Sequence, residues 1–108
     1  MIYTSQQIGE IIASVAKKYE LSSVYLFGSY ARNEAREDSD IDILIDESNS
    51  KIKSLLDMGA FYDEAQHLFE KEIDVVSAIA LNQPLNLRHG TYFRDTVLKE
   101  KVNIYERQ

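Results

Sequence analysis

Short apolar runs that alternate with stretches of helical periodicity constrain the fold of this chain most strongly. The runs are rich in β-branched and aromatic residues, which is typical of strands buried in a sheet. Strands are predicted at Ser23–Phe27, Ile41–Asp46, Ile73–Val76 and Val102–Tyr105. Helices are predicted at Thr4–Tyr19, Ser50–Phe69 and Thr91–Lys99, with a helical turn at Ser29–Glu34. This alternation predicts an α/β fold in which helices pack on one sheet.

The connections between the elements predict how the sheet is arranged. The chain between the first two strands is too short for a full crossover helix, so these strands are expected to be antiparallel. We therefore predict a mixed sheet of about four strands. The chain has 108 residues, close to the commonest size of one domain, and no linker or repeat divides it. Residues 1–108 are predicted to form a single domain.

Composition narrows the class of protein. The formal net charge is −6, which disfavours direct nucleic-acid binding as the main activity. There is no cysteine, which excludes disulfides, thiol nucleophiles and cysteine-bound zinc. His67 and His89 show no spacing typical of a metal or catalytic pair. No signal segment or stretch of about 20 apolar residues is present, so we expect a cytoplasmic protein without a membrane span.

Three aspartates occupy positions where fold stability alone would not place them. Asp42 and Asp74 each stand between aliphatic residues in a predicted strand, and a buried unpaired carboxylate is costly. Asp40 and Asp42 are two residues apart, so their side chains project from one face and repel each other. A divalent cation between them would offset this repulsion, and oxygen ligands suit Mg²⁺. Asp74 completes the cluster if its strand lies beside the second one.

A glycine and a serine follow the first strand. Gly28 would let a phosphate approach the backbone, and the hydroxyl of Ser29 could donate to it at the start of a helical turn. Arg32 and Arg36, just downstream, could meet the remaining phosphate charge. Gly-Ser by itself is a common turn dipeptide. Its fixed distance from Asp40 and Asp42 makes it a compound signal for a nucleotide site.

The two segments together resemble a known signature. Phe27-Gly28-Ser29-Tyr30-Ala31-Arg32, followed by Asp38-Ser39-Asp40-Ile41-Asp42-Ile43-Leu44-Ile45, is similar to the Gly-Ser, ten residues, Asp-x-Asp pattern of the DNA polymerase β-like nucleotidyltransferase superfamily. The short chain most resembles the minimal nucleotidyltransferase (MNT) branch, whose members are commonly antitoxins of HEPN-domain ribonuclease toxins. Two loop positions depart from the pattern: Asn33 stands where relatives often have Gly, and Glu37 where many have Pro.

This resemblance implies a nucleotidyltransferase fold, an activity and a set of site residues. Asp40 and Asp42 would hold two Mg²⁺ ions, and Asp74 would bind the catalytic metal and help deprotonate the attacking hydroxyl. Gly28 and Ser29 would hold the triphosphate of ATP, with Arg32 beside them. The reaction would be transfer of a nucleoside monophosphate, AMP from ATP, to a hydroxyl. The acceptor would be a tyrosine of a HEPN toxin, which this modification would silence.

Simpler interpretations stand beside this one. Asp40 and Asp42 could be solubilising charges at a strand edge, Asp74 could belong to a structural salt bridge, and Arg32 could simply solvate the end of a helix. At the level of function, the chain could be a non-catalytic antitoxin that neutralises its partner by contact. It could also be a small-molecule nucleotidyltransferase of the aminoglycoside-modifying type, although those relatives usually carry an additional helical domain.

Overall fold

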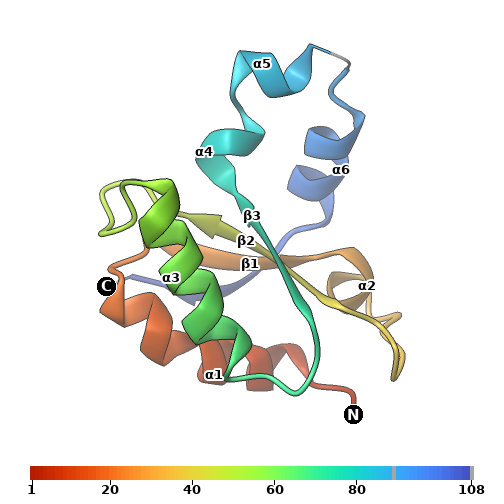
Figure 1. Cartoon of the computed structure of the whole chain (residues 1–108). Helices are drawn as coiled ribbons and strands as arrows, with labels where there is room; N and C mark the ends of the chain where they lie inside the picture. The colour runs from red at the N-terminus through yellow and green to blue at the C-terminus, as the bar shows by residue number, and fades with distance from the viewer. Residues whose placement is uncertain (89, 108) are drawn as a thin grey trace.

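A four-stranded mixed sheet forms the centre of the fold in the computed structural model, which describes residues 1–88 and 90–107 (Figure 1). The strands stand in the order β3-β2-β1-β4. Strand β1 is antiparallel to both β2 and β4, whereas β2 and β3 are parallel. The predicted mixed sheet and the antiparallel pairing of the first two strands are therefore confirmed. The strands are β1 (Ser23–Phe27), β2 (Ile41–Asp46), β3 (Ile73–Ser77) and β4 (Val102–Glu106).

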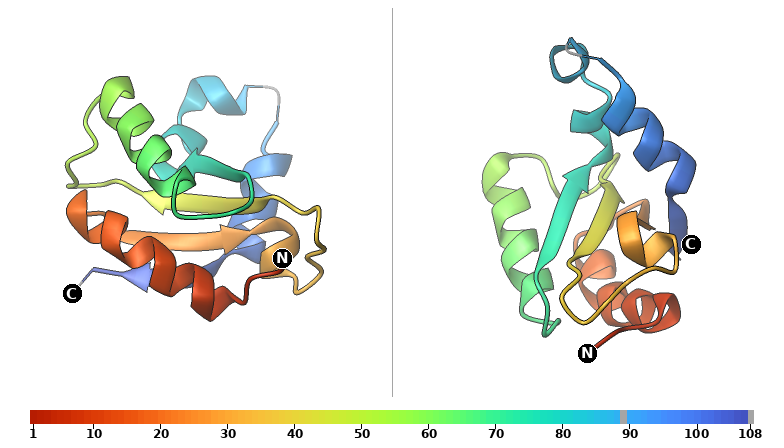
Figure 2. Two further views of the ribbon diagram at one scale, coloured as in Figure 1. Left: turned by 60° about the horizontal axis from the view of Figure 1, so that its bottom comes forward. Right: turned by 90° about the vertical axis from the view of Figure 1, so that its right-hand side faces the viewer.

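Helices cover both faces of this sheet (Figure 2). The two long helices α1 (Ser5–Lys18) and α3 (Leu55–Gln66) lie on one face. Helices α4 (Ala78–Leu81) and α6 (Tyr92–Glu100) pack on the other. The short helix α2 (Gly28–Ala31) follows β1 directly, and α5 (Pro84–Leu87) joins α4 to the segment before α6. Within the described residues, no helix is long and apolar enough to cross a bilayer.

Side chains along the strands alternate between two apolar clusters, which assigns each strand residue to a face. Ile41, Ile43 and Ile73 face the larger cluster under α1 and α3. Leu44 and Phe27 face the smaller cluster with Leu81 and Val97 from the opposite helices. Successive side chains of a strand point to opposite faces, so Asp42 of β2 and Asp74 of β3 point to the face that carries the smaller cluster. The core thus determines which face carries the carboxylates.

The helix boundaries follow their capping residues. Thr4 and Gln7 form the predicted capping box of α1, with the Gln7 amide donating to Thr4 Oγ1 at 3.0 Å and the Thr4 amide donating to Gln7 Oε1 at 2.8 Å. Helix α3 was predicted from Ser50 but begins after Ser54, whose hydroxyl accepts from the Asp57 amide at 3.1 Å. Two short helices, α4 and α5, were not predicted. His89 lies outside the described residues.

Candidate active site

Asp42 and Asp74 lie beside each other on neighbouring parallel strands. Asp42 of β2 is in register with Asp74 of β3 on one side and with Phe27, the last residue of β1, on the other. The Asp42 side chain is half-buried, and Asp74, on the edge strand of the sheet, is exposed. Asp40 is also exposed and directly precedes β2. The structure therefore brings Asp42 and Asp74 together, with Asp40 at the entry to β2, two residues before Asp42.

The electrostatics of this group show that the carboxylates act on one another. The pKa of Asp42 is raised to about 6, first because the carboxyl is partly buried and then because the negative charge of Asp74 lies close to it. Asp40 raises the pKa further, and Arg32 acts in the opposite direction. The raised pKa means that the ionised form of Asp42 is disfavoured in the metal-free protein.

The donor set of these residues fits a hard divalent cation. Carboxylate oxygens are the ligands that Mg²⁺ prefers, and a cation would offset the repulsion that raises the Asp42 pKa. Among residues 1–88 and 90–107, no three His, Cys, Asp or Glu side chains lie together as a set of metal ligands. In the protein alone, the carboxylates therefore form a close pair, Asp42 and Asp74, with Asp40 acting on it more weakly.

Gly28 is in contact with the Asp42 carboxylate. A Cβ atom placed on Gly28 would lie 2.2 Å from Asp42 Oδ2, and the φ angle of Gly28 is +71°, in the left-handed region. Both observations require glycine here, because any side chain would clash with the carboxylate and strain the backbone. The Gly-Ser turn and the aspartate strand are thus in direct contact, as their compound signal in the sequence suggests.

The other two predicted nucleotide contacts follow in or directly after α2. Ser29 is the second residue of that helix and is half-buried. The guanidinium of Arg32 is held by two carboxylates: Nε donates to Glu34 at 2.8 Å, and Nη1 donates to both oxygens of Glu100, at 2.7 and 2.9 Å. Arg32 therefore joins the end of α2 to the end of α6. In the protein alone, its charge is already paired.

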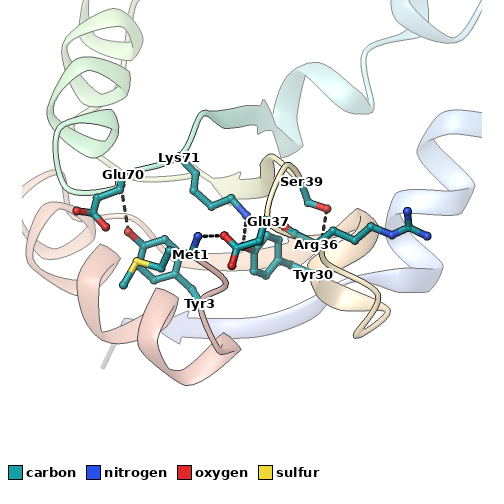
Figure 3. A network of polar contacts seen from close by, with 8 residues as sticks. All are labelled: Met1, Tyr3, Tyr30, Arg36, Glu37, Ser39, Glu70 and Lys71. Carbon is teal, nitrogen blue, oxygen red and sulfur yellow. Dashed lines mark hydrogen bonds and ion pairs between the residues drawn. The ribbon is translucent and has the colours of Figure 1, made fainter.

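The loop that carries Asp40 is held by a network around Lys71 (Figure 3). Lys71 Nζ donates to Tyr30 Oη at 2.8 Å and to the Arg36 carbonyl at 2.9 Å, and the Arg36 amide donates to Ser39 Oγ at 2.8 Å. Lys71 precedes β3 and thereby connects α2, the loop and the strand of Asp74. Sequence reasoning missed Lys71, because its partners come from distant segments and no local pattern marks it.

The two loop positions that depart from the family pattern, Glu37 and Asn33, each show a local feature in the structure. The Glu37 carboxylate pairs with the amino group of Met1 (Figure 3). Asn33 has a φ angle of +61°, a conformation in which Gly is most favourable and Asn is the best tolerated alternative. Asn33 therefore keeps the left-handed backbone conformation that glycine would adopt at this position.

A hollow of about 250 Å³ lies between α4, α5 and α6, on the face of the sheet that carries the carboxylates. Val76, two residues after Asp74 on β3, contributes to its wall together with Phe93 and Arg94 of α6. Phe93 packs edge-on against Phe27, with ring centroids 6.1 Å apart. Sequence reasoning did not identify these α6 residues as part of the site's surroundings.

Comparisons with known proteins agree on one family. Residues 10–108 match the model of the family described as Polymerase beta, Nucleotidyltransferase. A provisionally named protein adenylyltransferase of Methanocaldococcus jannaschii is 34% identical over 98 residues, covering 91% of this chain and 95% of that protein. The protein adenylyltransferase MntA of Thermococcus cleftensis is 30% identical over 105 residues, covering 94% of this chain and 96% of that protein.

A solved structure described as a toxin–antitoxin with AMP-PNP has the same fold. It superposes with a TM-score of 0.68 over 93% of this chain and 74% of that chain, at 19% identity. At this identity the likeness concerns the fold alone, and it supports the α/β nucleotidyltransferase architecture predicted above.

Proposed function

Because the chain belongs to the Polymerase beta nucleotidyltransferase family, we propose that it transfers AMP from ATP to a hydroxyl group of a partner protein. The observation that carries the proposal is the in-register pair of Asp42 and Asp74, with Gly28 against the Asp42 carboxylate. This arrangement puts the carboxylates next to the element that would hold phosphates. A nucleotidyltransferase needs both in one place, since it must position a triphosphate and activate a hydroxyl.

Asp40, Asp42 and Asp74 would hold two Mg²⁺ ions. Bound there, the ions would lower the pKa of the acceptor hydroxyl and neutralise charge that develops on the phosphates. Gly28 and Ser29 would bind the triphosphate through the backbone and the hydroxyl. Arg32 would join them by exchanging one of its carboxylate partners for a phosphate.

The reaction itself would be a displacement at the α-phosphorus. The acceptor oxygen forms a bond to that phosphorus, the bond from the α-phosphorus to the bridging oxygen breaks, and pyrophosphate leaves. Asp74 would accept the proton of the acceptor hydroxyl, and its exposure on the edge strand leaves room for a large acceptor.

The proposed acceptor is a tyrosine of a HEPN-domain ribonuclease toxin, so that the chain acts as its antitoxin in the cytoplasm. Three observations support this assignment. Relatives of nearly the same length are named protein adenylyltransferases, and a protein of the same fold is described as a toxin–antitoxin with AMP-PNP. The small domain itself is largely sheet and covering helices, which favours a protein acceptor that brings its own surface.

The test is transfer of radioactive label from ATP to a co-purified HEPN-domain protein in the presence of Mg²⁺. The Asp40→Asn/Asp42→Asn double variant and ATP labelled at the γ-phosphorus serve as controls. We expect labelling from the α position alone, and its loss in the double variant. If no label is transferred while both proteins still inhibit the toxin, the chain neutralises by contact. Labelling of an aminoglycoside instead would identify a small-molecule enzyme.

A further inference from the structure

A groove of about 1250 Å³ opens on the opposite side of β3 from the carboxylates. The first half of α3, the second half of β3 and α4 form its walls. The C-terminal half of α3 is held close to β3, where Tyr62 Oη donates to the Ile73 carbonyl at 3.3 Å and the Ile73 amide donates to Gln66 at 3.0 Å. Among the described residues, no side-chain hydrogen bond joins the N-terminal half of α3 to β3, and most of the α3 residues that line the groove lie in this half.

The groove carries apolar side chains that the fold leaves uncovered. Leu55 and Leu56, at the start of α3, are 92% and 85% exposed, and Ile79 of α4 is 45% exposed. Gly59 of α3 lines the same groove, and a Cβ atom added there would meet no atom within 4 Å. Large apolar side chains that gather in a groove mark a binding surface more often than scattered ones do.

Glu47 adds a second and independent feature. It lines the groove, and its residue is only 8% exposed. One carboxylate oxygen accepts from the hydroxyl of Ser77, but the other, Oε1, is buried without a hydrogen-bond partner among the described residues. A buried carboxylate oxygen without a donor is costly, so its position calls for a group that the chain alone does not supply.

The backbone of β3 supplies a third feature. The Ile41 amide of β2 donates to the Glu72 carbonyl at 3.0 Å. In a parallel strand, every second residue directs its backbone N–H and C=O groups to the same neighbouring strand. Glu72, Asp74 and Val76 therefore turn their backbone groups toward β2, and Val75 turns its own groups outward, into the groove. Because β3 is an edge strand, no strand among residues 1–88 and 90–107 pairs with those groups of Val75.

We propose that this groove is the docking site for a segment of the acceptor protein, which inserts apolar side chains beside Gly59 and a basic side chain toward Glu47. This inference rests on the proposed function and adds where the acceptor is held. A polypeptide is the ligand that combines apolar side chains, a cationic donor and backbone groups that can pair with Val75. The same edge strand carries Asp74 one residue earlier, on its other face, so a docked segment is held against the strand that also carries the proposed proton acceptor.

Charge favours a basic partner over a second copy of this chain. The net charge is −6, and Asp63 lines the groove together with Glu47, against a single cationic side chain in the lining, that of Lys53. Two copies that met here would bring like charges together, whereas a basic partner gains attraction and speed of association.

The test measures binding and transfer separately, with a co-purified HEPN-domain protein as the probe. Gly59→Trp fills the groove and Gly59→Ala is the matched control, since alanine adds only one methyl group and favours the helix. We expect Gly59→Trp to weaken binding on the order of 100-fold in titration calorimetry. The alanine variant should bind as the natural chain does. Both should keep the rise in melting temperature that Mg²⁺ and ATP cause.

A second variant tests the charge without adding bulk. Glu47→Gln keeps an acceptor for Ser77 and removes the negative charge, so we expect binding about 30-fold weaker and less sensitive to salt. Leu68→Asp, on an exposed apolar residue outside the groove, should leave the affinity unchanged.

The outcomes separate this inference from the proposed function. Unchanged affinity of both Gly59→Trp and Glu47→Gln would overturn the docking site, even if label transfer proceeds normally. Loss of affinity in these variants would support the docking site, even if the natural chain transfers no label. Sedimentation showing that the natural chain dimerises, and that Gly59→Trp abolishes the dimer, would overturn the assignment to a partner protein.

Discussion

Asp42 and Asp74 occupy directly opposed positions on two parallel strands, although 31 residues separate them in the chain. Their proximity shows in the raised pKa of Asp42, about 6, caused first by partial burial and next by the charge of Asp74. The pair therefore weakens the fold when both groups are ionised. It also supplies the negative site to which a cation would bind.

Removing the Asp42 charge should stabilise the metal-free protein at neutral pH. The folded-state pKa lies above the ordinary value of 3.8, so the folded protein holds the proton more tightly than the unfolded chain does. Stability consequently falls as the pH rises from about 4 to about 6. Asp42→Asn should gain about 1 kcal/mol at pH 7.5, after allowance for solvent screening, or about 5 °C in melting temperature.

Thermal denaturation in EDTA at pH 7.5 and at pH 4 measures this difference. The gain should disappear at pH 4, where the natural Asp42 is already protonated. Asp38→Asn removes the same charge from an exposed loop position and should change little at either pH. An Asp42→Asn variant less stable than the natural protein at pH 7.5 would contradict the prediction.

Mg²⁺ should stabilise the natural protein and fail to stabilise Asp42→Asn. A cation that binds the folded state alone raises stability by mass action, and about 100 times its dissociation constant contributes about 2.7 kcal/mol. Melting curves over a Mg²⁺ series, with and without ATP, measure the effect. Equal rises in melting temperature for the natural protein and Asp42→Asn would show that the cation binds at another site.

Gly28→Ala should impair nucleotide binding and transfer through two effects at once. Alanine strains a backbone with φ +71°, and its Cβ atom displaces the Asp42 carboxylate, 2.2 Å from it. A shift of about 1 Å in a reacting group can reduce the rate about 100-fold. Transfer assays and calorimetry with Mg²⁺ and ATP measure both effects. Gly59→Ala, where the added methyl group meets no atom, should bind ATP normally.

Lys71→Met should slow transfer while leaving the chain folded. The variant keeps the apolar stem but loses the donors to Tyr30 Oη and the Arg36 carbonyl, so the loop before Asp40 loses its anchor. We expect kcat to fall about tenfold with a loss of about 1 kcal/mol in stability. Steady-state kinetics and urea unfolding measure the two quantities. Lys51→Met, at an exposed ion pair with Glu20, should change neither.

Asn33→Gly should preserve stability, whereas Asn33→Ala should reduce it by about 1 kcal/mol. The φ angle of +61° is accessible to glycine and asparagine at low cost and strained for alanine. Urea unfolding of the natural protein and the two variants measures their order of stability. Similar stability of the alanine and glycine variants would show that the turn can adopt another conformation.

Much of the architecture could be predicted from periodicity, because each strand is a short apolar run with a clear end. Strands β1 and β2 have their predicted bounds, and the aspartates lie on one face because side chains alternate. The short helices α4 and α5 were missed, since four-residue helices carry no periodic signal. The start of α3 was misplaced because Ser54, rather than Ser50, caps the helix.

The candidate site shows a similar division. The fixed spacing of Gly28, Asp40 and Asp42 and the place of Asp74 in an apolar strand predicted a common site, and the structure brings Gly28 and Asp74 next to Asp42. The contacts of Lys71 and the pairing of Arg32 with Glu100 could not be predicted, since they join segments that are 35 and 68 residues apart. The order of the strands, with β4 beside β1, also depends on long-range packing that local patterns do not encode.

The side chains of β3 alternate between the two faces of the sheet, and this limits how the strand can change in evolution. Ile73 is fully buried on one face, while Asp74 meets Asp42 on the other. A slip of one residue would put a carboxylate into the core and an isoleucine beside Asp42, so it would disrupt the fold and the proposed metal site together. Mutations that shift the register of this strand would therefore be removed by selection for folding alone. Surface loops and the groove remain free to diverge and to follow a changing partner.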